Sequence, residues 1–236
     1  MRETQVATAA GQMPVQHFPS SDSAPLVIIL MDAIGIREEL RDVARLVQRE
    51  GYNVALPNLY YREGPVENLD MNAADDRDTI MRLYKGYSHQ MALQDITALL
   101  DQFTHRPVGL LGYCMGGAKA LVLAGSLPSK IAAAAAIHPG GIATGAEDSP
   151  HRLAPLSSGE LYIAIADEDP YATPKQVQQL TTALDEADTQ YTLEHYSDAH
   201  HGFAFASLPT YNTEAQHRYQ QATLALFNRA LMRPQA

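Results

Sequence analysis

Short runs of apolar residues alternate along the chain with longer stretches in which apolar residues recur every three or four positions. The run Leu26 to Met31 is apolar at every position, which is typical of a strand covered on both faces. From Ile36 to Glu50 the apolar residues follow a helical spacing instead, and Gly51 comes next as a helix-ending residue. The first part of the chain therefore predicts a central strand followed by an amphipathic helix.

The same alternation continues to the end of the sequence. The expected strands are an edge strand at Met13 to Phe18, then Leu26 to Met31, Tyr52 to Leu56, Val108 to Leu111, Ile131 to Ile137, Leu161 to Ala166 and Tyr191 to Tyr196. The expected helices are Ile36 to Glu50, Ala74 to Lys85, Ser88 to Phe103, Met115 to Leu123, Pro174 to Ala187 and Thr213 to Leu231. This order predicts one α/β domain over residues 1–236, with a mostly parallel central sheet and helices on both faces.

Two segments need separate interpretation. Asn58 to Asn72 has no clear period and is expected to be a loop. Ile131 to Ile137 is alanine-rich and suits a helix by propensity, but its length and the Pro-Gly-Gly stop that follows His138 favour a tightly covered strand. Ligands on sheets of this type bind beyond the carboxyl ends of the strands, so the loops at those ends should hold the chemistry.

Composition and charge narrow the function classes. Hydrophobic residues make up 46% of the 236 residues, which indicates a globular chain. The net charge of −10 argues against a nucleic-acid partner, because an acidic surface repels phosphates. No apolar segment has the length of a signal peptide core or a membrane span, and the single cysteine allows no intramolecular disulfide. These features predict a cytoplasmic protein without nucleic-acid or membrane partners, either a monomer or a small homo-oligomer.

The segment Gly112-Tyr113-Cys114-Met115-Gly116-Gly117 lies between an expected strand and an expected helix. A nucleophile elbow needs that context, because a sharp turn lifts its central side chain above the sheet. The helix that begins there favours a thiolate, and the backbone N–H of Met115 is placed as an oxyanion donor. Cys114 is therefore the candidate nucleophile, and the alternative is a small buried apolar residue between packing glycines.

In folds with this elbow an acid and then a histidine follow the nucleophile along the chain. Asp169 is the preferred acid and Asp167 the competitor, since both follow the expected strand that ends at Ala166. His201 is preferred over His200 as the base because it directly precedes a Gly-Phe pair. The adjacent histidines also raise metal binding, but no third ligand has a suitable spacing, so neither a metal nor another cofactor is expected.

These motifs resemble the dienelactone hydrolase family of α/β-hydrolases, and the resemblance runs over nearly the whole chain. It is carried by the cysteine elbow, by Asp169-Pro170, by the segment from His201 to Phe205, and by Met31-Asp32-Ala33-Ile34-Gly35. The resemblance implies that Asp32 helps to activate the thiol and that the N–H of Ala33 completes the oxyanion hole. Alternatively, Asp32 caps the turn that follows it.

The resemblance also implies a substrate site. Arg77 matches a family arginine that binds the substrate carboxylate, whereas Met81 and Phe205 stand where the family pattern has a tyrosine and a second arginine. The pocket is therefore expected to be more apolar, with Tyr113, Phe203 and Phe205 among its lining. The expected activity is hydrolysis of a lactone or small carboxylic ester. The alternatives are a broad carboxylesterase or thioesterase, and a non-catalytic binding scaffold.

Overall fold

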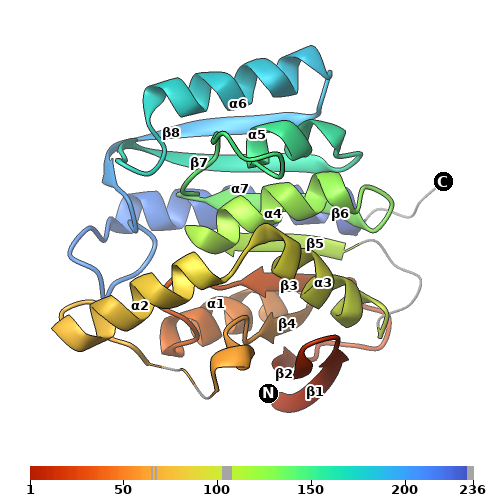
Figure 1. The fold of residues 1–236 in the computed structure, drawn as a ribbon. Coiled ribbons are helices and arrows are strands. Elements are labelled where there is room, and N and C mark those ends of the chain that lie inside the picture. Colours follow the sequence, from red (N-terminus) through yellow and green to blue (C-terminus); the bar gives the residue numbers. More distant parts are fainter. Residues whose placement is uncertain (65, 67, 103–107, 233–236) are drawn as a thin grey trace.

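Eight strands form one sheet in the computed structural model, which describes residues 1–64, 66, 68–102 and 108–232. The sheet order is β1-β2-β4-β3-β5-β6-β7-β8 (Figure 1). The strands are β1 (Arg2–Thr8), β2 (Gly11–Phe18), β3 (Leu26–Leu30), β4 (Asn53–Pro57), β5 (Val108–Tyr113), β6 (Ile131–Ile137), β7 (Glu160–Glu168) and β8 (Tyr191–His200). β1 and β2 pair antiparallel, and the strands from β4 across to β8 are all parallel, which confirms the predicted α/β class.

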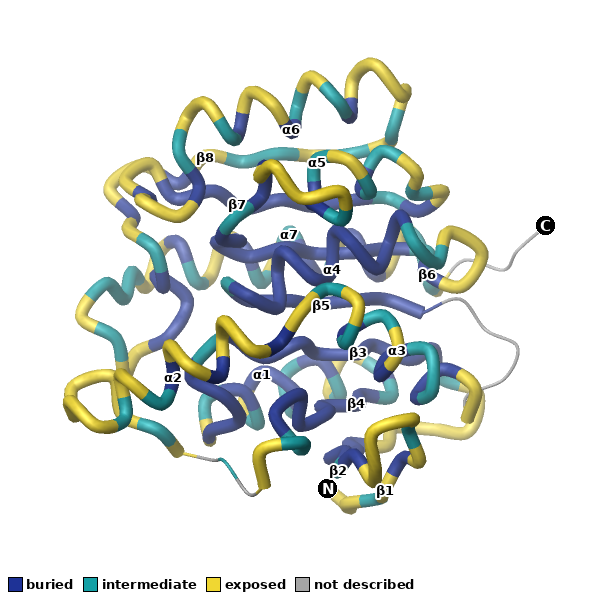
Figure 2. Tube along the Cα trace, viewed as in Figure 1, coloured by how far each residue is buried: buried dark blue, intermediate teal, exposed yellow. Residues whose placement is uncertain are grey.

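Helices cover both faces of this sheet. They are α1 (Glu38–Arg49), α2 (Ala74–Gly86), α3 (His89–Leu100), α4 (Met115–Ser126), α5 (Pro150–Leu153), α6 (Pro174–Glu186) and α7 (Thr213–Leu231), with 3₁₀ turns η1 (Tyr61–Glu63) and η2 (Ala154–Leu156). Two glycines of β5 show the two faces, since a Cβ on Gly109 would meet α7 and a Cβ on Gly112 would meet α4. Figure 2 shows the central strands and α4 buried almost throughout, whereas α2 and α6 carry many exposed residues.

The alanine-rich run Ile131 to Ile137 is a strand, as its flanking sequence indicated. It lies between α4 and α7, which both contact it. The side chains of residues 133–136 are all alanine and fully buried. Small side chains let the two helices approach the sheet closely, so packing against neighbours overrides the helix propensity of alanine.

The edge of the sheet differs from the prediction. Met13 to Phe18 was expected at the edge, but β1 pairs outside β2 and takes that place. β1 is hard to find from the sequence because Val6 is its only buried residue. Sparse burial of this kind is typical of an exposed edge strand. Met13 to Phe18 does form a strand, but the prediction that this strand lies at the edge of the sheet is wrong, because β1 lies outside it.

β7 and β8 both extend beyond the apolar cores that predicted them. β7 continues to Glu168 and β8 to His200, and the two ends pair with each other in the sheet. Apart from the buried Ala199, the added residues are polar and exposed, so apolar periodicity could not detect them. Of the expected helix from Ser88 to Phe103, α3 covers His89–Leu100, and Phe103 lies outside the described residues. Among the described residues, no helix combines the length and apolar character needed to cross a bilayer.

Candidate active site

Cys114 occupies the sharp turn between β5 and α4. Its backbone has φ 50° and ψ −110°, a left-handed conformation that a side chain rarely adopts. The turn needs glycine on both sides, because a Cβ on Gly112 would lie 2.1 Å from the carbonyl oxygen of Gly116. A Cβ on Gly116 would lie 2.2 Å from the carbonyl oxygen of Leu30. The predicted elbow geometry is therefore present, and Cys114 is partly exposed rather than enclosed in the core.

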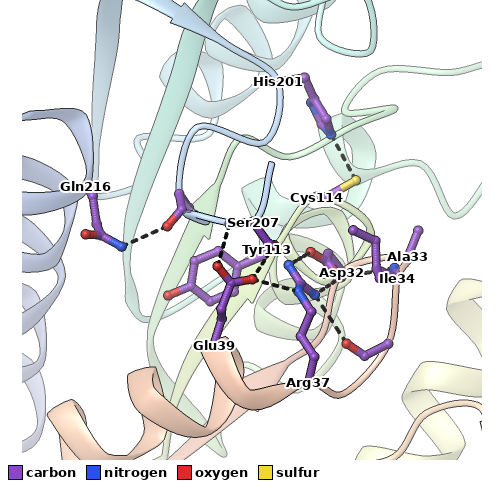
Figure 3. Close-up of polar contacts among 12 residues, drawn as sticks. Asp32, Ala33, Ile34, Arg37, Glu39, Tyr113, Cys114, His201, Ser207 and Gln216 are labelled. Carbon is purple, nitrogen blue, oxygen red and sulfur yellow. Dashed lines mark hydrogen bonds and ion pairs between the residues drawn. The ribbon is translucent and has the colours of Figure 1, made fainter. Parts of the chain in front are cut away.

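The side chains of Asp169 and His201 complete a chain of contacts to this cysteine. His201 Nε2 lies 3.0 Å from Cys114 Sγ, as Figure 3 shows, and His201 Nδ1 lies 2.8 Å from Asp169 Oδ2. The Asp169 side chain has no exposed surface, and its Oδ1 accepts a 2.8 Å hydrogen bond from the N–H of Tyr171. The carboxylate is thus held from both oxygens and fixes the orientation of the imidazole.

Electrostatics favour the charged form of this imidazole. Burial alone lowers the pKa of His201, but hydrogen bonds to Asp169 and Cys114, together with their charges, raise it to about 10. The ring therefore carries a proton at neutral pH when the thiol is ionised. An imidazolium beside the sulfur stabilises a thiolate nucleophile.

The competing acid and base both lie elsewhere. Asp167 Oδ1 is 3.7 Å from His195 Nδ1, and Glu168 Oε2 is 3.4 Å from His200 Nδ1. All four side chains are more than two-fifths exposed. Asp167, Glu168 and His200 lie at the ends of β7 and β8, and His195 lies in the middle of β8. The structure therefore brings together Asp169 and His201 beside the thiol and keeps the alternative residues at the surface.

Asp32 follows β3 but does not contact the thiol. Both of its oxygens accept 2.8 Å hydrogen bonds from the guanidinium of Arg37, and Oδ1 also accepts a 3.0 Å bond from the N–H of Ile34 (Figure 3). Burial is the largest influence on the pKa of Arg37 and lowers it, but the charges and hydrogen bonds of Asp32 and Glu39 together raise that pKa above its ordinary value. The geometry therefore shows Asp32 as a cap of the turn that follows it, which is the alternative stated above. It shows no direct contact of Asp32 with the thiol of Cys114.

The partner of Asp32 also ties two loops together. Arg37 Nε donates a 3.0 Å hydrogen bond to Glu39, whose carboxylate accepts bonds from the N–H and hydroxyl of Ser207 (Figure 3). Ser207 belongs to the loop that follows His201. The guanidinium of Arg37 also lies 4.3 Å from the centre of the Phe205 ring. This network runs from the buried Asp32 to the exposed Ser207 and joins the loop after β3 to the loop after β8.

Two backbone N–H groups near the elbow have no hydrogen-bond partner among the described residues. Met115 is the first residue of α4, so its N–H has no partner inside the helix. Among the described residues, the N–H of Ala33 donates no hydrogen bond either. Tyr60 links the two segments, because its hydroxyl donates to the Ala33 carbonyl at 3.1 Å and lies 3.5 Å from Met115 Sδ. This bridging contact of Tyr60 could not be predicted from the sequence, because it joins segments far apart in the chain.

The aromatic residues expected to line the pocket lie beneath the site. Tyr113 and Phe203 are fully buried and Phe205 is 2% exposed. Tyr113 points away from the adjacent Cys114 because successive strand residues face opposite sides, and its hydroxyl lies 3.4 Å from that of Tyr219. These rings support the site from below and offer no surface to a bound substrate.

Arg77 also lies away from the thiol chemistry. It is exposed on α2, and its guanidinium donates hydrogen bonds to the carbonyls of Met71 and Asn72 at 3.3 and 3.2 Å. The Arg77 side chain therefore binds the backbone just before its own helix. The exposed side chains that do adjoin the site are aromatic. Tyr171 is 57% exposed, and its ring lies 4.7 Å from that of His201. Tyr84 is 37% exposed, and burial first, then the charge of Cys114, raise its pKa.

His138 is a second buried imidazole next to His201. Both of its ring nitrogens lack a partner among the described residues, and its ring lies 5.1 Å from that of His201. Burial first, and then the charge of His201, lower its pKa well below the ordinary value. His138 is therefore neutral and packs against the charged ring of His201.

The described part of the chain contains no group of side chains suited to a metal ion, and the one hollow described below lies away from the thiol. No group of three His, Cys, Asp or Glu side chains there could hold a metal ion. A hollow of about 350 Å³ is lined by His151 and by residues of α6, including Gln178 and Glu186, and contains none of the three contacting side chains.

Comparisons with known proteins identify the family of this chain. A family model described as the dienelactone hydrolase family matches residues 14–231. A carboxymethylenebutenolidase from Pseudomonas sp. strain P51 is 26% identical over 218 residues, covering 90% of this chain and 88% of that protein. Carboxymethylenebutenolidase 1 from Cupriavidus pinatubonensis is 29% identical over 111 residues, so the match spans 45% of this chain and 47% of that relative.

The fold comparison points the same way. The solved structure of a candidate dienelactone hydrolase from Klebsiella pneumoniae has a TM-score of 0.84 at 23% identity, and covers 96% of this chain and 97% of that one. An identity this low carries the fold alone. With the family model matching almost the whole chain, however, this protein belongs to the dienelactone hydrolase family and is a hydrolase with the α/β-hydrolase fold.

Proposed function

We propose that this protein hydrolyses a lactone or small carboxylic ester, with Cys114 as nucleophile, His201 as base and Asp169 as the acid that orients it. The supporting observation is the unbroken run of contacts from Asp169 through His201 to the sulfur, at 2.8 and 3.0 Å. Three groups linked in this order perform acyl transfer on unrelated folds. The strained elbow conformation of Cys114 adds to this, since strain of that kind is kept where function requires it.

Acylation begins with attack of the Cys114 sulfur on the carbonyl carbon. The carbonyl oxygen takes the negative charge and accepts hydrogen bonds from the N–H groups of Met115 and Ala33. As the tetrahedral intermediate collapses, the C–O bond to the leaving group breaks and His201 gives it a proton. The products of this half are a thioester on Cys114, a neutral alcohol or enol, and a neutral imidazole. For a lactone, that hydroxyl remains attached to the acyl chain.

Deacylation uses the same groups in reverse. The neutral imidazole of His201 takes a proton from water, which attacks the thioester carbon. Collapse of the second intermediate expels the Cys114 thiolate and releases the carboxylic acid, which restores the imidazolium–thiolate pair. Asp169 keeps Nδ1 protonated throughout and favours the imidazolium stages.

Asp32 then acts at a distance from the sulfur. It accepts the Ile34 N–H and binds Arg37, so it fixes the turn that carries Ala33. The role for Asp32 is therefore to hold one oxyanion donor in position rather than to take a proton from the thiol.

A broad carboxylesterase or thioesterase is the second candidate. The exposed side chains near the thiol, Tyr84 and Tyr171, offer aromatic surface rather than a fixed cation. The expected substrate cation, Arg77, faces solvent on α2. Comparing kcat/KM for p-nitrophenyl acetate and for a dienelactone separates the two candidates. A lead of several tens-fold for the simple ester favours the broad esterase.

The decisive test of the proposal is Cys114→Ala. The variant should keep the wild-type Tm within a few degrees and lose at least about 10³-fold in kcat/KM for the better ester. Full activity in a folded Cys114→Ala protein rejects the proposed nucleophile. The predicted cytoplasmic location and monomeric or small homo-oligomeric state belong to this proposal, and gel filtration with light scattering checks the oligomeric state.

A further inference from the structure

Tyr60 is a buried residue between β4 and η1, and none of the catalytic steps above uses its hydroxyl. The side chain is 2% exposed. Its hydroxyl donates a 3.1 Å hydrogen bond to the carbonyl of Ala33 and lies 3.5 Å from Met115 Sδ. Ala33 and Met115 are the two residues whose backbone N–H groups are the proposed oxyanion donors. The hydroxyl of Tyr60 therefore contacts both halves of the proposed oxyanion hole.

The contact with Ala33 is made within a tight turn. The Gly35 N–H donates a 3.2 Å bond to the Asp32 carbonyl, which shares one planar peptide unit with the Ala33 N–H. The next peptide unit is held at both ends, because its N–H, on Ile34, donates to the Asp32 carboxylate (Figure 3) and its carbonyl accepts from Tyr60. Only the two backbone dihedrals of Ala33 separate these two peptide planes. Fixing the second plane therefore fixes the direction of the Ala33 N–H.

Tyr60 is itself held firmly enough to fix another group. Its N–H donates a 3.0 Å bond to Asn58 Oδ1, and its ring meets that of Tyr87 edge to face, with 6.2 Å between the ring centres. The chain that follows is anchored too, because two N–H groups of Arg62 bind the fully buried Asp95 carboxylate of α3 at 2.7 and 2.8 Å. The hydroxyl of Tyr60 thus has a defined position relative to the turn after β3.

The phenol of Tyr60 is a permanent hydrogen-bond donor. Burial first, and then the charges of Asp32 and Cys114, raise its pKa above the ordinary value, so the group keeps its proton at neutral pH. A phenol has one hydrogen to donate, and a carbonyl oxygen is a better acceptor than a thioether sulfur. The hydrogen is therefore given to Ala33, while Met115 Sδ packs against the phenol oxygen.

We propose that Tyr60 is a positioning residue for the oxyanion hole, and that its hydroxyl holds the Ala33–Ile34 peptide so that the Ala33 N–H points at the developing oxyanion. This rests on the proposed function. Asp32 holds the N–H end of the same peptide, so the two side chains fix it from opposite sides. In the competing, purely structural role, the hydroxyl only satisfies its own need for a hydrogen bond in the interior.

The test is Tyr60→Phe, which keeps the ring and removes the hydroxyl. Its kcat for an ester should fall about tenfold, less than the loss on deleting an oxyanion donor, because the Ala33 N–H remains but is held less firmly. KM should change less than about twofold, since the oxyanion exists in the transition state and not in the bound ester.

Two reagents that attack the same sulfur separate the oxyanion from the thiol. The Cys114 thiolate adds to the carbonyl carbon of trifluoroacetophenone, no group leaves, and the carbonyl oxygen takes the negative charge. The inhibition constant of this ketone should rise in Tyr60→Phe by the factor lost from kcat, about tenfold. Iodoacetamide instead forms a thioether by losing iodide and makes no oxyanion, so its rate constant with Cys114 should change less than about twofold.

Matched variants separate this effect from the loss of any buried hydroxyl. Tyr162→Phe removes a phenolic hydroxyl from β7, where it bonds to Glu194 at 2.9 Å, and should leave kcat and the inhibition constant unchanged. Both Phe variants should show a small decrease in Tm, since each loses a buried hydrogen bond. Tyr60→Met also lacks the hydroxyl, and should likewise raise the inhibition constant without changing the alkylation rate constant.

Three results overturn the proposal. A folded Tyr60→Phe protein with wild-type kcat and inhibition constant leaves the hydroxyl a structural role only. An equal loss in the alkylation rate constant shows that Tyr60 acts on the thiol, and a rise in KM alone shows that it binds substrate. Failure of the proposed function looks different, since Cys114→Ala would then retain hydrolysis, and the inference would fall with it.

Discussion

Two buried carboxylates lie at the carboxyl ends of the central strands, and each holds a cation, but only one of the two pairs reaches the sulfur. Asp169 binds an imidazole whose second nitrogen lies 3.0 Å from Cys114. Asp32 binds a guanidinium that uses its remaining donors on Glu39 and a backbone carbonyl. An imidazole can pass on a proton at neutral pH, whereas a guanidinium cannot. The cation, more than the carboxylate, decides which pair does chemistry and which holds a loop.

The sharpest way to test this difference is to neutralise each carboxylate in turn. Asp169→Asn should lower kcat by about 10³- to 10⁴-fold with little change in fold, because the amide no longer favours the correct tautomer or the charged ring. Asp32→Asn should cost less than about tenfold in kcat, since the amide oxygen still accepts the Ile34 N–H. Steady-state kinetics and Tm on both variants measure this. Equal losses of kcat would remove the distinction between the pairs.

The second prediction concerns Arg37, which is 8% exposed. Arg37→Met leaves the Asp32 carboxylate buried without its partner and should lower the free energy of unfolding by about 3–5 kcal/mol. The double variant Asp32→Asn with Arg37→Met removes both charges and should recover a large part of that loss. Urea unfolding of the three proteins provides the measurement. If Arg37→Met is as stable as the wild type, the pair of Asp32 and Arg37 does not hold the loop.

The third prediction follows from the raised pKa of His201. A group whose pKa is higher in the folded state stabilises the fold below its unfolded pKa, here 6.5, and loses that contribution as pH rises through its folded pKa of about 10. The Tm of the wild type should therefore fall more steeply than that of His201→Gln between pH 8 and 11. Other groups titrate in this range in both proteins, so the difference between the two curves is the quantity to compare. Parallel curves contradict a charged His201.

The two pairs also differ in how well the sequence predicts them. The elbow, Asp169 and His201 could be predicted because strand ends, chain order and glycine positions constrain them locally. The partner of Asp32 could not, because the contact between Asp32 and Arg37 depends on how the turn between them folds. β1 was missed because it buries one side chain, and the ends of β7 and β8 because they are polar. Features that depend on one long-range contact leave little periodic trace.

The last and smallest effect is expected at Arg77, which the resemblance placed at the substrate carboxylate. Its guanidinium binds the Met71 and Asn72 carbonyls on the outside of α2, so Arg77→Ala should change kcat/KM less than about twofold. Tyr171→Ala is the matched substitution beside the proposed catalytic residues, because Tyr171 is exposed and its ring packs on that of His201. It should raise KM for aromatic esters several-fold, since stacking and apolar contact are lost. If instead Arg77→Ala raises KM for carboxylate-bearing esters alone, α2 moves toward the thiol when substrate binds, and the apolar character assigned to the site applies only to its unliganded form.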